Sequence, residues 1–398
     1  MSKPMSSEQT SSQSFLRRTV REVFSHWGAR IGLAWILLLV FVGIFAPFLA
    51  NTMPLLMSRD GAISAPVLNY LSIEDIVVMT SAIVLAVMAI LPKRFPVRTF
   101  IMTGLIVAIG TALASNWLYP SKQVVVYQDI RTDLATNKPD WAIMPPIPYA
   151  PKDYLRDAQS QPLQAPLTEG EYRHLMGTEG NGADVMSRMI HATRIALAIG
   201  FIAVGIGMFI GVIVGGLMGY FSGIVDMLGM RLVEIFESIP TLFLLLTFVA
   251  FFGSNLYIMM IIIGVTSWSG YARYIRAEFL RLRKQDYVQG AIASGLPLRS
   301  ILFRHMLPNG VAPLLVAASF GIASAILAEA TLSFLGLGPV DSPSWGQMLD
   351  EAVKSSTFNW WMAVYPGGAI FMTVFAYNLI GEAFRDAIDP HMTEKAGA

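Results

Sequence analysis

Long stretches with few or no charged residues limit what this sequence can fold into more than any other feature. An apolar helix needs about 20 residues to cross the hydrocarbon core of a bilayer, which is about 30 Å thick. The uncharged stretch 238–272 is too long for one crossing, and Gly253-Ser254-Asn255 divides it. We therefore predict eight membrane-spanning helices, at about 31–50, 75–92, 99–118, 195–219, 234–252, 256–273, 311–332 and 359–381.

The composition agrees with a membrane protein and excludes several other classes. Of the 398 residues, 54% are hydrophobic and 14% are charged, whereas soluble domains carry about 25% charged residues. This balance excludes a disordered chain, a collagen and, with no Cys present, a disulfide-stapled secreted fold. The net charge of +1 gives no reason to expect nucleic acid as a partner. The predicted fold class is an all-α, polytopic membrane protein.

The placement of Lys and Arg predicts the orientation. Three clusters of basic residues, at 3–30, 93–98 and 273–304, fall on one side of the membrane if the eight spans alternate. Basic loops favour the cytoplasmic side, so both termini, including the tail 391–398, are predicted to be cytoplasmic. Arg188 and Arg194 lie near the outer end of the fourth span and go against this rule.

The N-terminal segment 1–30 is predicted to be cytoplasmic and uncleaved, because its apolar stretch is too long for a signal peptide. One face of a helix would collect five apolar side chains: Leu16, Val20, Val23, Phe24 and Trp27. This pattern predicts a helix lying in the cytoplasmic membrane interface. The alternative is an ordinary helix packed on the protein.

The sequence contains no recognisable catalytic or nucleotide site. No Lys follows a Gly, so the phosphate-binding loop of ATPases cannot be present, and no GxSxG motif occurs. The five His are never close together or at helical ligand spacing. We predict no enzyme activity, cofactor or metal in this chain. Glu329, the deepest intramembrane carboxyl group, could serve a proton relay or be hydrogen-bonded locally.

Glycines recur every fourth residue along the fourth span, at Gly207, Gly211, Gly215 and Gly219. Small residues at this spacing let helices pack backbone to backbone in lipid. We predict a helix-packing contact, within the subunit or with a second one. The alternative is that these glycines line a pore.

The connection after the sixth predicted span is basic and has the pattern of a helix, a turn and a second short helix. Residues 286–295 (DYVQGAIASG) would form a helix with a nearly bare face, and Leu296-Pro297 would end it. Pro308-Asn309 marks the entry to the next span. Such a segment suits either a docking surface for a soluble partner or a solvated connector.

This connection resembles the EAA loop of the membrane subunits of ABC importers, which docks on their ATPases. Gln289-Gly290-Ala291 takes the EAA place, Gly295 the Gly place and His305 the Ile place, and Leu307-Pro308 closes the motif. Gln289 replaces Glu, which removes the charge that a salt bridge there would need. The resemblance implies an ATPase-docking loop that includes Asp286, Gln289, Gly290, Ala291, Gly295, Arg304, His305, Leu307 and Pro308.

Further motifs are similar to those of the oligopeptide/dipeptide/nickel permeases. Residues 174–188 (HLMGTEGNGADVMSR) resemble HxLGTDxxGRDVxSR, and 327–349 resemble LAEAxLSFLGLG…PSWGxML. Residues 366–390 end on the RDAxDP of that family, and with 230–240 the likeness covers about 174–390. The motif residues that we single out are Gly177, Thr178, Gly182, Asp184, Arg188, Glu329, Trp345 and Gly346.

The resemblance implies a type I ABC importer permease fold with a six-helix core. Its first span would be 31–50 and the rest of its core 174–390. The interval 51–173 does not fit the family: it would be an insertion with two extra spans and a Pro-rich outer loop.

The resemblance also implies the partners. They would be two ATPase subunits that bind ATP and Mg²⁺, a second permease subunit and an extracytoplasmic binding protein, at the cytoplasmic (inner) membrane. The cargo would be peptides or similar small solutes, nickel chelates included. The alternatives are a proton-coupled secondary transporter acting through Glu329 and, outside transport, a membrane scaffold or enzyme.

Overall fold

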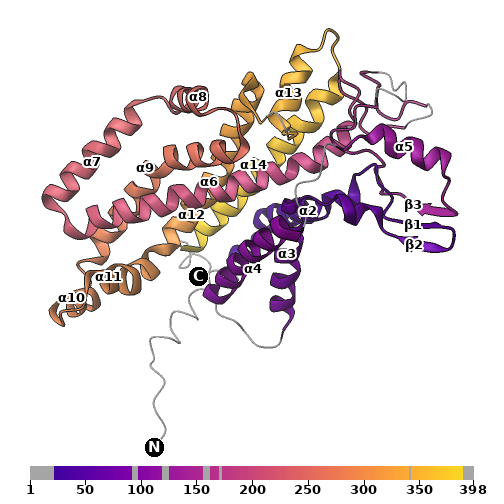
Figure 1. Ribbon diagram of the computed structural model, residues 1–398. Helices are drawn as coiled ribbons and strands as arrows, with labels where there is room; N and C mark the ends of the chain where they lie inside the picture. The colour runs from indigo at the N-terminus through magenta and orange to yellow at the C-terminus, as the bar shows by residue number, and fades with distance from the viewer. Residues whose placement is uncertain are drawn as a thin grey trace, which may run out of the picture. The chain divides into compact units, whose positions relative to one another are not determined.

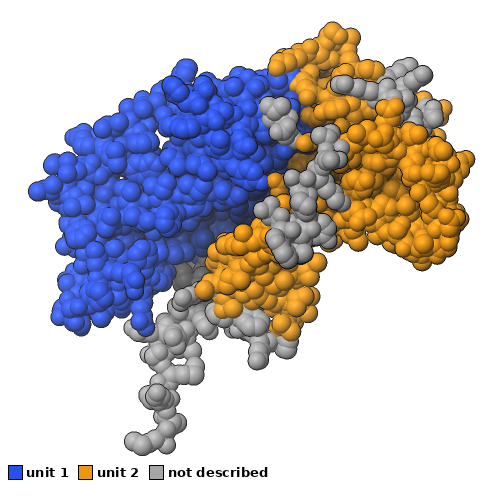
Figure 2. All heavy atoms as spheres, viewed as in Figure 1, with its two compact units in different colours: residues 1–38, 195–350, 366–398 blue, residues 39–194, 351–365 orange. Residues whose placement is uncertain are grey.

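The computed structural model describes residues 22–91, 97–118, 125–155, 162–169, 173–339 and 342–388. The chain forms two compact units, shown in Figure 2. Unit 1 comprises residues 1–38, 195–350 and 366–398, and unit 2 comprises residues 39–194 and 351–365. Three long helices belong in part to each unit: α2 (Trp27–Leu49), α6 (Val185–Phe221) and α14 (Trp360–Ile388).

Helices account for every predicted span, but fewer of them meet the length and composition of a crossing. Among the described residues, five helices do so: α2, α3 (Ile73–Ile90), α6, the stretch Pro313–Leu337 and α14. A bent pair makes a sixth. The apolar part of α4 (Val97–Leu118) runs only from Thr99 to Ala114, and α9 (Leu256–Leu282) carries several Arg in its second half. The prediction of eight spans is therefore corrected to five or six by this measure.

The predicted span 234–252 is wrong as a single helix. The chain instead forms α7 (Gly223–Ser238) and α8 (Thr241–Phe252), whose axes bend by 82°. Pro240 has no N–H to continue a helix, and its ring pushes the preceding residue out of the helical region. Ile239 accordingly has an extended backbone, with φ −89° and ψ 123°.

Unit 2 contains a small antiparallel sheet that the all-α prediction missed. Its strands are β1 (Leu56–Arg59), β2 (Ala62–Ser64) and β3 (Trp141–Ile143), in the order β2-β1-β3 (Figure 1). β1 pairs Ser58 with Ile63 of β2 and with Trp141 of β3. Strands of three or four residues are too short to leave an alternating pattern, although the Asp60-Gly61 turn is a hairpin signal.

The sheet joins residues 56–64, near the beginning of the 51–173 interval, to residues 141–143 in its second half. Between its strands lie the 3₁₀ turn η1 (Pro66–Tyr70), the α3–α4 hairpin and α5 (Tyr127–Thr136). In the hairpin, α3 and α4 pack along each other. The interval thus returns to its starting point, which lets it interrupt the core without redirecting the chain.

The described part of the N-terminal segment packs on the protein. Val23 is buried with Ala29 and Ala383, and a turn at 24–26 separates it from α2. Val23 and Phe24 of the predicted apolar face make this contact, whereas Trp27 is exposed, so the interface helix and its alternative both stay predictions. Leu16 and Val20 of the predicted interface helix lie outside the described residues, as does the tail 391–398.

Unit 1 is built around close contact between α6 and α9. The four glycines at spacing four lie on the face of α6 that meets α9. A Cβ at Gly215 would lie 2.2 Å from the carbonyl oxygen of Ala272, and one at Gly211 would lie 2.9 Å from that of Trp268. At Gly219 the nearest backbone atom is the carbonyl oxygen of Arg276, and at Gly207 the nearest atom is the Ser267 hydroxyl. This is a contact within the chain, made by backbone on backbone.

Candidate coupling segment and buried outer cap

The segment that resembles the EAA loop forms α10 (Asp286–Ala293), α11 (Leu298–Ser300) and a π-helical turn (Ile301–Met306) that leads into α12 (Leu307–Leu332). Figure 1 shows α10 and α11 together at one end of unit 1. We call residues 286–308 the coupling segment. Its helix–turn–helix form agrees with the expectation from the sequence.

Gly295 makes the turn after α10 possible. Its φ is +67°, a left-handed conformation that favours glycine. The Leu296 N–H donates to the carbonyl of Ala291 (3.2 Å), and the Gly295 N–H donates to that of Ile292 (3.0 Å). These two bonds are the Schellman motif, which closes the C-terminus of a helix. Backbone geometry therefore explains why a Gly stands at this place of the motif.

The outer face of α10 is small and open. Val288 and Ala291 are buried, whereas Gln289 and Gly290 are exposed, and a Cβ at Gly290 would meet nothing within 4 Å. The Gln289 side chain bends back, its Nε2 donating to the carbonyl of Arg283 (2.7 Å). Asp286 is exposed at the start of the helix. Little protrudes from this face, so a partner's backbone can approach it closely.

The second half of the coupling segment anchors it to unit 1. Met306 is buried, and the neighbouring His305 donates from Nδ1 to the carbonyl of Ser300 (3.0 Å). Leu307 is half-buried, whereas Arg304 and Pro308 are exposed. A π-helical turn shifts the helical register by one residue and is frequent at functional sites. The segment thus has a bare docking face at α10 and a fixed base at the start of α12.

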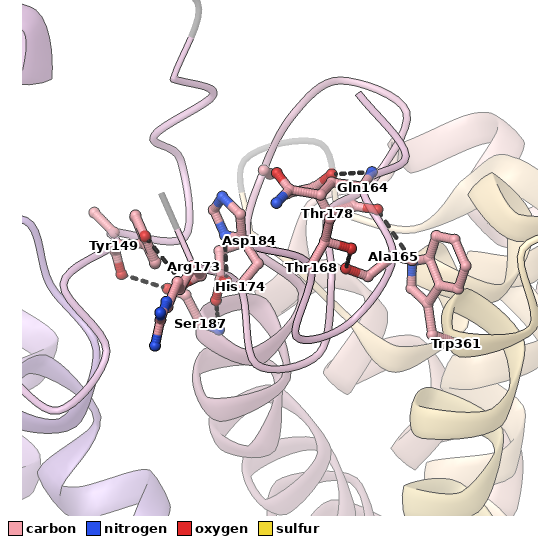
Figure 3. A network of polar contacts seen from close by, with 12 residues as sticks. Tyr149, Gln164, Ala165, Thr168, Arg173, His174, Thr178, Asp184, Ser187 and Trp361 are labelled. Atoms are coloured by element: carbon pink, nitrogen blue, oxygen red, sulfur yellow. Dashed lines mark hydrogen bonds and ion pairs between the residues drawn. The ribbon is translucent and has the colours of Figure 1, made fainter. Parts of the chain in front are cut away.

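Residues 174–188 form a buried cap at the start of α6 (Figure 3), which we call the outer cap after the orientation predicted from the sequence. Asp184 organises it with both carboxylate oxygens. Oδ1 accepts from the N–H of Ser187 (2.7 Å), which caps α6, and Oδ2 accepts from Nδ1 of His174 (2.8 Å). His174 stacks on Tyr149, whose carbonyl accepts from the Ser187 hydroxyl (2.7 Å). The polar side chains of His174, Asp184 and Ser187 are therefore buried and hydrogen-bonded.

Gly177 and Gly182 let the outer cap close on its neighbours. Both have positive φ, +79° and +89°. A Cβ at Gly177 would lie 2.6 Å from the carbonyl oxygen of Gln164, and one at Gly182 would lie 2.7 Å from that of Tyr154. Any other residue would have to adopt a strained backbone and displace a backbone carbonyl.

Thr178 bonds the outer cap to two other segments. Its N–H donates to the carbonyl of Gln164 (3.0 Å) and its Oγ1 accepts from the N–H of Gln164 (2.8 Å). Its carbonyl accepts from Nε1 of Trp361 at the start of α14 (3.2 Å). Figure 3 shows Thr178 between these partners.

A buried ion cluster lies beside these contacts. Arg188 is 2.8 Å from Glu179 through Nε, and its Nη2 is 3.4 Å from Glu351 of α13 (Trp345–Lys354). Burial raises the pKa of Glu179 well above its usual value; Arg188 opposes the shift and the second carboxylate adds to it. Arg188, which goes against the basic-residue rule, is therefore held by two acids of this chain.

Glu329 is hydrogen-bonded within its own turn, as one of the two hypotheses expected. Its carboxylate accepts from the hydroxyl of Ser333 (2.6 Å). One residue later, the carbonyl oxygen of Ala330 would lie 2.3 Å from a Cβ at Gly346. Trp345 is buried beside it. The motif 327–349 therefore brings the end of α12 and the start of α13 into backbone contact.

Sequence reasoning missed the partners Glu351 and Trp361. Both lie more than 150 residues from the outer cap, and neither stands out in composition or periodicity. The available signal was Arg188 itself, since a cation near the end of a span needs a counter-charge. The sequence places Glu179 and Asp184 nearby but does not indicate Glu351. The coupling segment and the glycine face belong to unit 1 and the outer cap belongs to unit 2, and each is described as a local arrangement of its own unit.

We predict that Asp184→Ala lowers the free energy of unfolding by about 2–4 kcal/mol, because it removes a helix cap and leaves the His174 N–H buried without an acceptor. Thermal unfolding of the purified protein measures this. Asp184→Asn keeps an acceptor and should lose less than half as much. Thr168→Ala, which removes an exposed local hydrogen bond in the same region, is the control. Equal losses for Ala and Asn would contradict the assignment.

Two ranges of the chain match known protein families. Residues 207–394 match the family described as "Binding-protein-dependent transport system inner membrane component". Residues 14–66 match the "N-terminal TM domain of oligopeptide transport permease C". The two ranges leave residues 67–206 between them, which includes most of the interval that did not fit.

Individual relatives are similar over more than half of the chain. The oligopeptide transport system permease protein OppC of Haemophilus influenzae is 37% identical, over 57% of this chain and 72% of its own length. The dipeptide permease protein DppC of Alkalihalophilus pseudofirmus is 34% identical, over 63% and 81%. The glutathione permease protein GsiD of Pectobacterium atrosepticum is 38% identical, over 57% and 76%. Among solved structures, the inward-facing MetNI methionine ABC transporter aligns with 50% of this chain and 97% of its own at 20% identity, with a TM-score of 0.41.

Proposed function

Because the chain belongs to the OppC family of ABC importer permeases, we propose that it carries peptides inward in a complex whose ATPase subunits dock on residues 286–308. The chain is the membrane component, and ATP is hydrolysed by a separate protein. Peptides of two or more residues, glutathione included, are the proposed cargo, because the similar relatives serve oligopeptides, dipeptides and glutathione. Nickel chelates are an alternative cargo.

The observation that carries the docking proposal is the bare face of α10 ended by a Gly295 turn. A short helix with small exposed residues presents its backbone to a groove, and the anchored base at Met306 transmits a push into α12. Closure of two ATPases, each with ATP and Mg²⁺, would move this segment as a rigid body. The spans would then alternate between outward and inward access.

The full assembly follows from the same family membership. An importer permease of this family works with ATPases, a paired permease and a binding protein. We propose two ATPases, one further permease subunit and an extracytoplasmic protein that delivers the solute. Both termini and the coupling segment would lie on the cytoplasmic side of the inner membrane, with six core helices and the α3–α4 pair as an inserted hairpin.

Uptake by proteoliposomes that contain the complete complex tests the proposed function. Labelled di- to pentapeptides should accumulate only with ATP inside and binding protein outside, and a protonophore should not lower the rate. Uptake that collapses with the protonophore and ignores ATP would overturn the proposal and restore the secondary-transporter alternative. Competition by glutathione or a nickel chelate then separates the cargo classes.

Glu329 gives a second test of the same point. We expect Glu329→Gln to retain most of the uptake rate, because the amide keeps an acceptor for Ser333 and ATP supplies the energy. A proton relay would be indicated if the uptake rate fell more than roughly tenfold while assembly stayed normal. That fall corresponds to about 1.5 kcal/mol of activation free energy. Ser333→Ala is the control for the local hydrogen bond.

A further inference from the structure

Arg194 of α6 contacts two other elements of unit 2 through one guanidinium group. Its Nε donates to the carbonyl of Gly43 in α2 (2.5 Å), and its Nη2 donates to that of Ile44 (3.3 Å). Its Nη1 forms an ion pair with Oδ1 of Asp75, in the first turn of α3. The same group therefore touches α2, α6 and the inserted hairpin.

The bond to Gly43 has a cause in the sequence of α2. In an α-helix the carbonyl of residue 43 accepts from the N–H of residue 47. Residue 47 is Pro, which has no N–H, so the Gly43 carbonyl has no partner within its own helix. Nε of Arg194 takes the place of the missing N–H. An unsatisfied carbonyl in a membrane costs several kcal/mol, so this replacement matters.

Asp75 is committed on both of its oxygens. Oδ2 accepts from the N–H and the hydroxyl of Ser72 (2.7 and 2.8 Å), which closes a capping box at the start of α3. Oδ1 faces Arg194. Asp75 is only 7% exposed, and a charge at such a place must be paired. The carboxylate comes from the interval 51–173, whereas Arg194 comes from the permease core.

We propose that Arg194 is a positioning residue that fixes the inserted hairpin to the permease core, with Asp75 as its counter-charge and the carbonyl freed by Pro47 as its second partner. The insertion is then an integral part of the outer half of this permease: without Asp75, a half-buried arginine near the outer end of α6 would be left without its acid. Arg194, which goes against the basic-residue rule, is explained by an acid that the insertion supplies.

Thermal unfolding of the purified full-length protein tests the pair. We expect Asp75→Asn and Arg194→Met each to lower the midpoint by about 5–10 °C, because removing one member of a partly buried pair leaves the other without its counter-charge. Glu74→Gln changes an exposed acid on the same turn and should lower the midpoint by clearly less. Ser72→Ala removes the capping box alone and should cost clearly less than Asp75→Asn.

Rescue by a third substitution separates positioning from general damage. Pro47→Ala supplies an N–H that can donate to the Gly43 carbonyl. It should therefore recover part of the unfolding midpoint that is lost in the Arg194→Met background. In the wild-type background, where Arg194 already holds the carbonyl, the gain should be smaller by at least about 2 °C. Equal gains in both backgrounds would overturn the role assigned to the Gly43 bond.

A distance measurement reports on the hairpin itself. The chain has no Cys, so spin labels can be placed by Phe41→Cys on α2 and Ile83→Cys on α3, two exposed positions of unit 2. We expect a single narrow distance distribution that broadens with Asp75→Asn and with Arg194→Met but not with Glu74→Gln. An unchanged distribution in both variants would refute the positioning role, even if the midpoint falls.

Discussion

Gly215→Leu is expected to abolish accumulation of folded protein in the membrane. A Cβ at this position would lie 2.2 Å from the carbonyl oxygen and 2.8 Å from the Cα of Ala272, so the side chain would meet backbone that cannot rotate away. The helices α6 and α9 would have to separate along their whole contact, at a cost of at least about 3 kcal/mol. The yield of monodisperse protein after mild detergent extraction measures the effect.

Gly205→Leu is the matched control for this prediction. Gly205 lies on the same helix, is exposed, and has nothing within 4 Å of an added Cβ. Its substitution also raises helix propensity, by about 0.5–1 kcal/mol. We expect normal yield from Gly205→Leu. Similar yields from both variants would show that the α6–α9 contact is not as close as described.

Gly295→Asp is expected to uncouple the permease from its ATPases without unfolding it. A residue other than Gly at φ +67° costs about 1–2 kcal/mol, and the added carboxylate would project into the docking face. A Cβ there meets nothing within 4 Å, so no packing clash adds to this local backbone cost. We expect peptide uptake and copurification of the ATPase to fall about tenfold, which corresponds to a loss of about 1.4 kcal/mol of binding free energy between permease and ATPase.

Two nearby substitutions separate the causes. Asn tolerates left-handed backbone and carries no charge, so Gly295→Asn should keep most of the uptake. Gly290→Ala adds only one methyl group, which meets nothing in this chain, and it restores the Ala that the EAA motif has at this place, so docking should be kept. Uptake and ATPase assembly at wild-type levels in Gly295→Asp, with equal amounts of permease in the membrane, would refute docking at the coupling segment.

The sequence pattern predicted the helices better than it predicted where they break. Stretches with few charges marked where helices lie because burying charge in hydrocarbon is costly whatever the helix packs against, although fewer of these helices qualify as spans than predicted. The break at Pro240 was visible as a residue, but a Pro in a span can kink, break or be bridged by neighbours. Pro47 shows the other outcome: α2 continues past it, and Arg194 fills the gap.

The short sheet escaped prediction for a different reason. Its strands pair residues that are about 80 positions apart, such as Ser58 with Trp141. Strands of three and four residues gain their stability from that pairing and from the Asp60-Gly61 turn, not from a pattern along the chain. Only the folded chain brings the two ends of the interval together.

The candidate sites divide in the same way. The coupling segment could be predicted from the sequence because its form depends on local rules: a short helix, a left-handed Gly and a Leu-Pro break. The outer cap could be recognised as a motif, but its roles could not be assigned. Asp184 caps a helix next to it in sequence, whereas Thr178 depends on Trp361.

The sequence by itself determined that this chain is a multi-span membrane protein and where most of its helices lie, because these properties follow from local composition and from spacing within a few turns. Its motifs indicated the permease family by resemblance, and with it the segment that we propose to dock. Only the tertiary structure decided which charges are paired: Arg188 with Glu179 and Glu351, and Arg194 with Asp75. A buried charge needs its partner within a few ångströms in space, and distance along the chain carries no information about that.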